Sequence, residues 1–80
     1  MTVTIYTTSW CPYCHMAKRY LTAQDVPYSE IDIEQEGITR EDLYKITQGR
    51  TVPQIIIDEK PIGGYDNMMA LVQSGELNFN

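Results

Sequence analysis

The sequence predicts an α/β fold in which a four-stranded mixed sheet is flanked by three helices. The predicted order is strand, helix, strand, helix, strand, strand, helix. Two patterns carry this prediction: apolar and polar residues alternate in some segments, as in half-buried strands, and apolar residues recur every three or four positions in others, as in helices. The length of 80 residues supports one domain, residues 1–80, built around one core.

The first strand is expected over Val3–Thr7, where most side chains are β-branched or aromatic. The first helix is expected to begin at Pro12, because the first turn of a helix leaves its backbone N–H groups unpaired and proline lacks that group. Its apolar positions are Met16, Ala17, Tyr20 and Leu21. Their spacing predicts one buried face on this helix.

The second strand is expected over residues 28–33, where apolar and polar side chains alternate. Thr39 and Asp42 have the spacing of a helix cap and its acidic partner. They predict a second helix with Leu43 and Ile46 on its inward face, ending near Gly49.

Two further strands are expected over residues 52–57 and 61–63, joined by a turn at residues 58–60. The last helix is expected over residues 66–74, ending at Gly75. A right-handed crossover makes the first two strands parallel, and the hairpin adds two more. The sheet is therefore predicted to be mixed.

Cys11 and Cys14 are the only cysteines, and they stand where the first strand meets the first helix. A redox-active dithiol, part of a metal site and a structural disulfide are the three interpretations of such a pair. A structural zinc site needs about four protein ligands, and His15, the only histidine, is expected on another face of the helix. Cys-x-x-Cys beside a strand-helix-strand pattern is typical of a thioredoxin-like redox motif.

The expected compartment also favours redox chemistry. The first residues lack the basic and apolar regions of a signal peptide, and the longest apolar run is only Ile55-Ile56-Ile57. We therefore expect a cytoplasmic protein without a membrane span. Permanent disulfides are rare in that compartment, so a structural disulfide is the weakest of the three interpretations.

The position of Cys11 at a helix start predicts its chemistry. Unpaired backbone N–H groups and the positive end of the helix dipole both favour a thiolate there. We expect Cys11 to act as the nucleophile and Cys14, one turn further along the same face, to resolve the mixed disulfide. Pro12 stiffens this turn. Tyr13 is either a wall for the substrate or an ordinary surface aromatic.

The chain carries eleven acidic and six basic residues, a net charge of -5. This charge disfavours nucleic acid and anionic membranes as partners. The basic residues that could lie near the cysteines are Lys18, Arg19, Arg40 and Arg50. A local positive patch of this kind would suit a small anionic substrate.

Three separated motifs stand in the chain: Cys11-Pro12-Tyr13-Cys14, Thr51-Val52-Pro53 and Gly63-Gly64-Tyr65-Asp66. With them the sequence resembles the glutaredoxins, specifically the small bacterial dithiol type, over essentially its whole length. The resemblance implies a thioredoxin-like fold and reduction of protein disulfides and protein–glutathione mixed disulfides. Glutathione would be the co-substrate, with no tightly bound cofactor and no metal. The implied protein is a monomer whose partners are disulfide-containing or glutathionylated proteins, ribonucleotide reductase among the candidates.

The resemblance also implies how glutathione binds. Thr51 and Val52 would hold its cysteinyl part, next to a Pro53 whose peptide bond is cis in the family. Without the other motifs, Pro53 could simply begin an edge strand.

The ends of glutathione would meet two other segments. Gly64 would let the backbone approach the ligand, and the N–H groups of Asp66 and Asn67 would receive the γ-glutamyl carboxylate. The Asp66 side chain would take the neighbouring ammonium or cap the helix. Arg40 is the first candidate for the glycyl carboxylate. Gln48 and Arg50 are the next candidates.

Two positions depart from the family pattern. Thr8 stands where many members carry a lysine, and Asn67 stands where a second aspartate is frequent. Either the thiolate is less stabilised or another cation takes the place of that lysine. Two rival functions also remain: a redoxin recharged by thioredoxin reductase that donates electrons to ribonucleotide reductase, and a dimer bridged by an iron–sulfur cluster.

Overall fold

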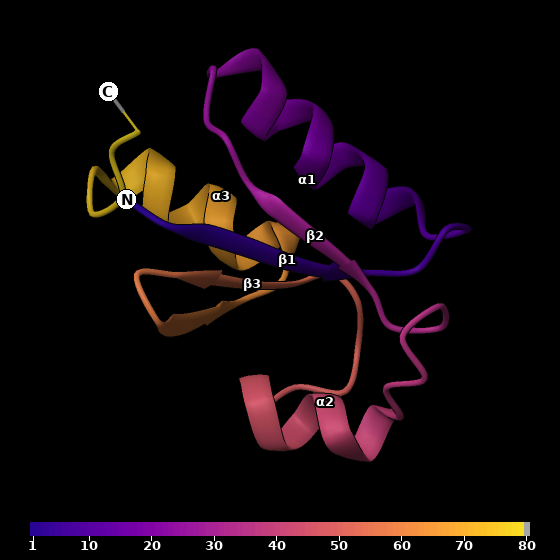
Figure 1. Ribbon diagram of the computed structural model, residues 1–80. Coiled ribbons are helices and arrows are strands. Elements are labelled where there is room, and N and C mark those ends of the chain that lie inside the picture. The colour runs from indigo at the N-terminus through magenta and orange to yellow at the C-terminus, as the bar shows by residue number, and fades with distance from the viewer. Residues whose placement is uncertain (80) are drawn as a thin grey trace.

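The computed structural model describes residues 1–79, and the predicted order of elements is confirmed. In chain order they are β1 (Val3–Thr7), α1 (Pro12–Ala23), β2 (Ser29–Asp32), α2 (Arg40–Thr47), β3 (Gln54–Ile57), β4 (Lys60–Gly63) and α3 (Tyr65–Ser74). The strands form one sheet in the order β2-β1-β3-β4. Helices α1 and α3 cover one face of this sheet and α2 lies against the other (Figure 1).

The strand directions agree with a mixed sheet. β1 pairs with β2 in parallel and with β3 antiparallel, and β3 pairs with β4 antiparallel. The parallel pair needs the crossover through α1, which carries the chain from the end of β1 back to the start of β2. The end of β1 and the start of α1 therefore meet at one edge of the molecule, where the two cysteines lie.

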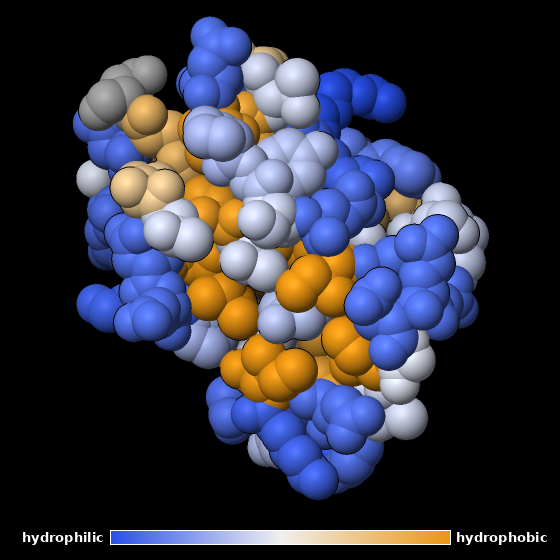
Figure 2. All heavy atoms as spheres, viewed as in Figure 1, coloured by the Kyte–Doolittle hydropathy of each residue, from blue (hydrophilic) through white to orange (hydrophobic). Residues whose placement is uncertain are grey.

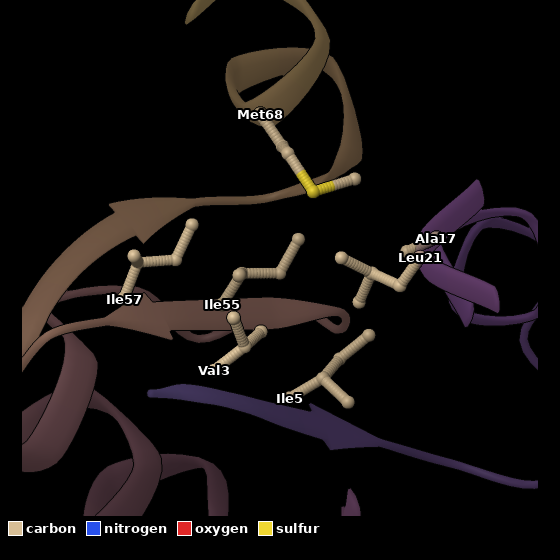
Figure 3. Close-up of a cluster of buried hydrophobic side chains, with 7 residues drawn as sticks. All are labelled: Val3, Ile5, Ala17, Leu21, Ile55, Ile57 and Met68. Atoms are coloured by element: carbon tan, nitrogen blue, oxygen red, sulfur yellow. The ribbon is translucent and has the colours of Figure 1, made fainter. Parts of the chain in front are cut away.

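The two faces of the sheet have separate apolar clusters. In Figure 3, side chains of β1, β3, α1 and α3 converge in the larger cluster. Its buried members are Val3, Ile5, Ala17, Leu21, Ile55, Ile57 and Met68. Alternation along β1 sends Tyr6 to the other face, where it packs with Ile33 and Leu43. The predicted period-two pattern of β1 thus divides its residues between the two clusters.

The face that carries α2 is only partly covered, because Ile31, Ile38, Val52 and Ile56 around its cluster are only partly buried. Apolar side chains are visible in the middle of the molecule and near α2, with polar side chains around them (Figure 2). Ile46 on α2 is 43% exposed, although the sequence pattern placed it on the inward face. Leu43 is fully buried. The second buried residue of α2 is Thr47, four positions after Leu43, so Ile46 lies at the margin of the inward face.

The hairpin turn is shorter than the sequence predicted. β4 begins at Lys60, so the turn consists of Asp58 and Glu59 alone, with φ of 51° and 70°. Two central residues with positive φ match the twist of a two-residue hairpin. Asp58 is fastened to the start of the chain, because its carboxylate accepts the N–H of Thr2 and its own N–H donates to the Thr2 carbonyl, both at 2.8 Å.

The helix ends also differ in detail from the prediction. The capping box of Thr39 and Asp42 is confirmed, with hydrogen bonds of 3.0 and 3.2 Å. α2 ends in a left-handed residue that is Gln48, with φ of 69°, and not at Gly49. α3 begins at Tyr65, one residue earlier than predicted, and its cap residue is Gly64. Strands β2 and β3 are shorter than predicted, at Ser29–Asp32 and Gln54–Ile57.

Candidate active site

The two cysteines lie at the start of α1 as free thiols. Cys11 is the cap residue, in an extended conformation, and Pro12 opens the helix. The Sγ atom of Cys11 accepts the backbone N–H of Cys14 at 3.2 Å. This N–H is one of the donors that a helix start leaves unpaired, so the sulfur takes the place of a capping oxygen. Such a donor favours a negative charge on the sulfur.

The two thiols differ in their surroundings. Cys14 is fully buried, whereas Cys11 keeps 4% of its surface exposed. Burial, reinforced by the hydrogen bond with Cys11, raises the pKa of Cys14 to about 12. A backbone hydrogen bond from Thr8 and the charge of Lys18 oppose this rise without cancelling it. Cys14 therefore stays a protonated thiol at neutral pH, and Cys11 is the less buried of the two cysteines.

A groove of about 590 Å³ passes between the helix starts and the loop before β3. Its lining contains every predicted glutathione-binding residue except the two arginines, Arg40 and Arg50. The predicted residues in the lining are Tyr13, Thr51, Val52, Pro53, Gly64, Asp66 and Asn67. Gln48, a further candidate for the glycyl carboxylate, also lines it, and residues outside the prediction complete the lining: Thr47, Gly49, Gln54, Gly63 and Tyr65. Sequence segments far apart are thus brought together into one surface.

The loop before β3 forms the wall of the groove nearest Cys11. The peptide bond between Val52 and Pro53 is cis, as the family resemblance implies. The Val52 carbonyl oxygen lies 3.4 Å from Cys11 Sγ and accepts its thiol hydrogen. On the opposite side, the rings of Tyr13 and Tyr65 lie 6.2 Å apart between centroids. The Tyr13 side chain is 54% exposed and lines the groove.

The start of α3 forms the far end of the groove. The Asn67 side-chain oxygen accepts the N–H of Gly64 at 3.0 Å, so Asn67 and not Asp66 makes the side-chain hydrogen bond at this helix start. Asp66 lies in the first turn and lines the groove. Within residues 1–79 no cation or hydrogen-bond donor pairs with its carboxylate. The free N–H groups of this turn and the Asp66 carboxylate are thus both available to a ligand.

Arg40 and Arg50 lie outside the groove lining. Arg40 Nη1 donates to the Arg50 carbonyl at 3.0 Å. The Arg50 guanidinium stacks 4.1 Å over the ring of Tyr44 and lies 3.6 Å from the carboxylate of Glu41. Gln48 is the one residue of this predicted trio that lines the groove. The proposed role of Arg40 in binding a carboxylate stays a prediction.

A charged cluster that the sequence analysis did not assemble lies behind Cys14. The ammonium of Lys18 is 2.9 Å from Glu30 Oε2, and the hydroxyl of Thr7 donates to the same oxygen at 2.8 Å. These contacts raise the pKa of Lys18 and lower that of Glu30, so both stay charged at neutral pH. Lys18 was predicted among the basic residues that could lie near the cysteines, and it follows Cys14 by one helical turn. Its pairing with Glu30 was not predicted.

Metal-ligating side chains do not gather in the described part of the chain. Residues 1–79 contain no group of three or more His, Cys, Asp and Glu side chains able to hold a metal ion. The Nε2 atom of His15 lies 3.0 Å from the Ser9 carbonyl oxygen.

No helix among residues 1–79 is long and apolar enough to cross a membrane. A second groove of about 620 Å³ is lined by Glu30, Asp32 and Glu36, whose charges would repel an anion.

Comparison with known proteins identifies this arrangement. The family model described as Glutaredoxin matches residues 3–62. The chain belongs to the glutaredoxin family. It is 43% identical over 76 residues to Glutaredoxin 3 of Escherichia coli K12, covering 95% of this chain and 92% of that one. A glutaredoxin of Haemophilus influenzae is 46% identical over 81 residues, covering 91% and 92% of the two chains.

Solved glutaredoxins share the fold. A buckwheat glutaredoxin–glutathione complex superposes with a TM-score of 0.84 at 29% identity, covering 94% of this chain and 71% of that one. The structure of Escherichia coli glutaredoxin gives a TM-score of 0.69 at 36% identity, covering 94% and 96%. The predicted thioredoxin-like fold is confirmed. Family membership and the paired thiols at the start of α1 support thiol–disulfide oxidoreductase activity.

Proposed function

We propose that this glutaredoxin reduces protein disulfides and protein–glutathione mixed disulfides with electrons from glutathione. One observation carries the proposal: Cys11 Sγ sits at the start of α1 with the Cys14 N–H directed at it, 3.4 Å from the carbonyl oxygen of Val52, which lines the groove. Cys11 is the less buried of the two cysteines, and burial raises the pKa of Cys14. Cys11 is therefore the nucleophile and Cys14 the resolving thiol.

The groove supports glutathione as the co-substrate. Glutathione is a small dianionic peptide with one ammonium group, and the start of α3 presents N–H groups together with the unpaired Asp66 carboxylate. The N–H groups of Asp66 and Asn67 would take the γ-glutamyl carboxylate, and the Asp66 side chain its ammonium. The backbone of Val52, beside Cys11, would pair with the cysteinyl part as an added strand.

The reaction follows from these positions. The Cys11 thiolate attacks the glutathione sulfur of a mixed disulfide, and the protein thiolate leaves and takes up a proton from water. Glutathione can then attack the Cys11–glutathione disulfide and release oxidised glutathione. With a protein disulfide, Cys11 forms a mixed disulfide with the substrate, and Cys14 attacks Cys11 to release the reduced substrate. Two glutathione molecules then reduce the Cys11–Cys14 disulfide.

The expected partners follow from this chemistry. They are glutathione and glutathionylated or disulfide-containing proteins, with ribonucleotide reductase as a candidate. We propose that the protein acts as a monomer in the cytoplasm and needs no tightly bound cofactor. Its net charge of -5 disfavours nucleic acid as a partner.

Matched cysteine variants test the proposal. Cys11→Ser should lower reduction of both a peptide–glutathione mixed disulfide and a protein disulfide by at least about 100-fold, because both routes need the nucleophile. Cys14→Ser should retain the first activity and lose the second. Retained activity in Cys11→Ser would overturn the assignment of the nucleophile.

The electron donor is tested separately. The oxidised protein should be reduced by glutathione and recycled by glutathione reductase with NADPH. The parallel reaction contains thioredoxin reductase and NADPH in place of the glutathione system. Reduction only in that second reaction would replace glutathione by a dedicated reductase as the source of electrons.

A further inference from the structure

Lys18, Glu30 and Thr7 form a cluster of polar contacts close to Cys14. Starting from Cys14, one turn of α1 leads to Lys18, whose ammonium lies 2.9 Å from Glu30 Oε2 on β2. The hydroxyl of Thr7, at the end of β1, donates to that oxygen at 2.8 Å. Thr7 is followed by Thr8, whose carbonyl accepts the N–H of Cys11 at 3.5 Å, next to the start of α1. Three elements thus fix Lys18 relative to the resolving thiol.

Because these side chains are largely buried, the charge of Lys18 acts more strongly on its neighbours than a charge on the open surface would. Cys14 and Thr7 are fully buried, and the Lys18 side chain is only 21% exposed. A lysine in free solution samples many rotamers, so its charge is spread over a wide volume. Here the contact with Glu30 holds the ammonium in one place, on a residue one helical turn from Cys14. Charges in such partly desolvated positions interact more strongly than charges on an open surface.

The titratable groups around this site are few. Those that interact with Cys14 are Cys11 and Lys18, those that interact with Lys18 are Glu30, Tyr28 and Cys14, and His15 interacts with Glu30. Lys18 is the only cation in the set that acts on Cys14. Cys11 acts in the opposite direction, because a negative charge on it disfavours a second negative charge nearby.

We propose that Lys18, held by Glu30 and Thr7, is a positioning residue for the second half of the reaction, in which it promotes ionisation of Cys14. The inference rests on the proposed function, since it needs Cys14 to be the resolving thiol. In the mixed disulfide the Cys11 sulfur carries no charge, and Lys18, one helical turn from Cys14, is the charged group that still acts on Cys14. Lys18 therefore affects the attack of Cys14 on the mixed disulfide and not the first attack by Cys11.

The step balances as an internal thiol–disulfide exchange. Cys14 gives its proton to a solvent base, and its thiolate attacks Cys11 Sγ. The bond between Cys11 and the substrate sulfur breaks, and the Cys11–Cys14 bond forms. The substrate sulfur leaves with the electron pair and is protonated from water. The protein dithiol is oxidised by two electrons and the substrate is reduced by two.

Closure of the Cys11–Cys14 disulfide measures this step directly. Reduced protein is mixed with oxidised glutathione, and the Cys11–glutathione disulfide and its closure product are followed by acid quenching and mass spectrometry from pH 6 to pH 9. Lys18→Met should slow closure by on the order of three- to tenfold at pH 7 and shift its pH profile to higher pH. Lys18→Arg should restore most of the rate, because the cation is kept.

Controls separate this inference from structural damage and from failure of the proposed function. Lys60→Met removes an exposed charge from β4 and should leave closure unchanged. In a Cys14→Ser background, Lys18→Met should leave turnover of a glutathione mixed disulfide within about twofold, because that route needs only Cys11. Lys18→Gln provides a second neutral side chain in case the methionine variant folds poorly.

Two results would overturn the role of Lys18. One is an unchanged rate and pH profile of closure in both neutral variants. The other is equal slowing of the route that needs only Cys11, which would place the effect of Lys18 on Cys11 or on the fold. If wild-type protein formed no Cys11–Cys14 disulfide at all, the proposed function itself would be wrong, so the two failures give different results.

Discussion

Gly63 is the position where a single methyl group should disturb both the fold and the groove. Its φ is +102°, a backbone conformation that side chains with a Cβ rarely adopt. A Cβ at this position would also lie 2.6 Å from the side-chain oxygen of Asn67. That oxygen accepts the N–H of Gly64 at the start of α3. Gly63→Ala therefore strains the backbone and displaces the side chain that caps α3.

The magnitude follows from these two effects. A residue with a Cβ in the left-handed region costs about 1–2 kcal/mol. Displacing Asn67 adds about 1 kcal/mol for the lost hydrogen bond at the helix start. Gly37→Ala is the matched control, because Gly37 has φ of +68° and a Cβ there would meet no atom within 4 Å. We expect Gly63→Ala to lower the free energy of unfolding by about 2–3 kcal/mol and Gly37→Ala by about 1 kcal/mol.

Urea unfolding of the two variants, with Asn67→Ala and the double variant Gly63→Ala/Asn67→Ala, measures both effects. Asn67→Ala removes the obstacle, so the two substitutions should be coupled by about 1 kcal/mol in the double-mutant cycle. Because Gly63 and Asn67 line the groove, Gly63→Ala should also raise the KM for a glutathione mixed disulfide. Equal destabilisation by Gly63→Ala and Gly37→Ala would refute the reasoning, because it would mean that the Asn67 contact has no effect.

Three further substitutions test the hairpin, the charged cluster and the core. Glu59→Gly should stabilise the protein by about 0.5 kcal/mol, because glycine adopts a positive φ without strain. Asp58→Gly should not stabilise it, because it also removes the carboxylate that accepts the N–H of Thr2. The urea midpoints of the two variants compare these effects. The contact with Lys18 holds the pKa of Glu30 below its usual 4.5, so its carboxylate stabilises the fold above that pH and the effect is lost as pH falls. Glu30→Gln should therefore be less stable than the wild-type protein by up to about 1 kcal/mol at pH 7 and equally stable near pH 2. Thermal unfolding of both proteins at the two pH values measures the difference. Leu21→Ala should lower the unfolding free energy by about 3 kcal/mol, because the side chain is fully buried between α1 and the sheet, and a loss under 1 kcal/mol would contradict the packing.

The fold could be predicted because its local patterns agree with its long-range contacts. The alternation in β1 sorted Ile5 and Tyr6 onto opposite faces, and the capping box placed the start of α2 correctly. The hairpin turn was predicted one residue too long, because neither Asp58 nor Glu59 is a glycine and no local signal marks their positive φ. The fixation of Asp58 by Thr2, 56 residues away, supplies what the local sequence lacks.

The end of α2 shows a different kind of failure. Glycine is the usual residue in a left-handed helix end, so Gly49 was the natural prediction. The structure uses Gln48 there, and a Cβ on Gly49 would collide with the Gln54 side chain. Gly49 is thus needed for a close approach to β3 and not for its backbone angle. A single sequence cannot separate these two uses of glycine.

The candidate site was predictable where a motif carries it, and less so where it depends on contacts between elements. The helix start fixed the roles expected for Cys11 and Cys14. Arg40 was chosen by charge alone, and its guanidinium is directed to the Arg50 carbonyl instead of lining the groove. The pair of Lys18 and Glu30 joins α1 to β2, so periodicity in either segment alone could not identify it.

Thr8 provides the last test, because it departs from the family pattern and its environment is unusual. Its side chain is fully buried, and within residues 1–79 its hydroxyl oxygen has no hydrogen-bond partner. Burying a hydroxyl without a partner costs about 1–3 kcal/mol, and valine has nearly the same shape without that group. Thr8→Val should therefore raise the free energy of unfolding by about 1 kcal/mol, measured by urea denaturation.

Thr47→Val is the matched control for this substitution. The Thr47 hydroxyl is also buried, but it donates to the Leu43 carbonyl at 2.9 Å and accepts the Gly49 N–H at 3.2 Å. Removing it leaves the Gly49 N–H without that acceptor, so Thr47→Val should lower the free energy of unfolding by about 1–2 kcal/mol. Opposite signs for two Thr→Val changes would show that satisfied hydrogen bonds, and not the loss of a hydroxyl as such, decide the outcome. A destabilised Thr8→Val variant would mean that the Thr8 hydroxyl stabilises the folded protein.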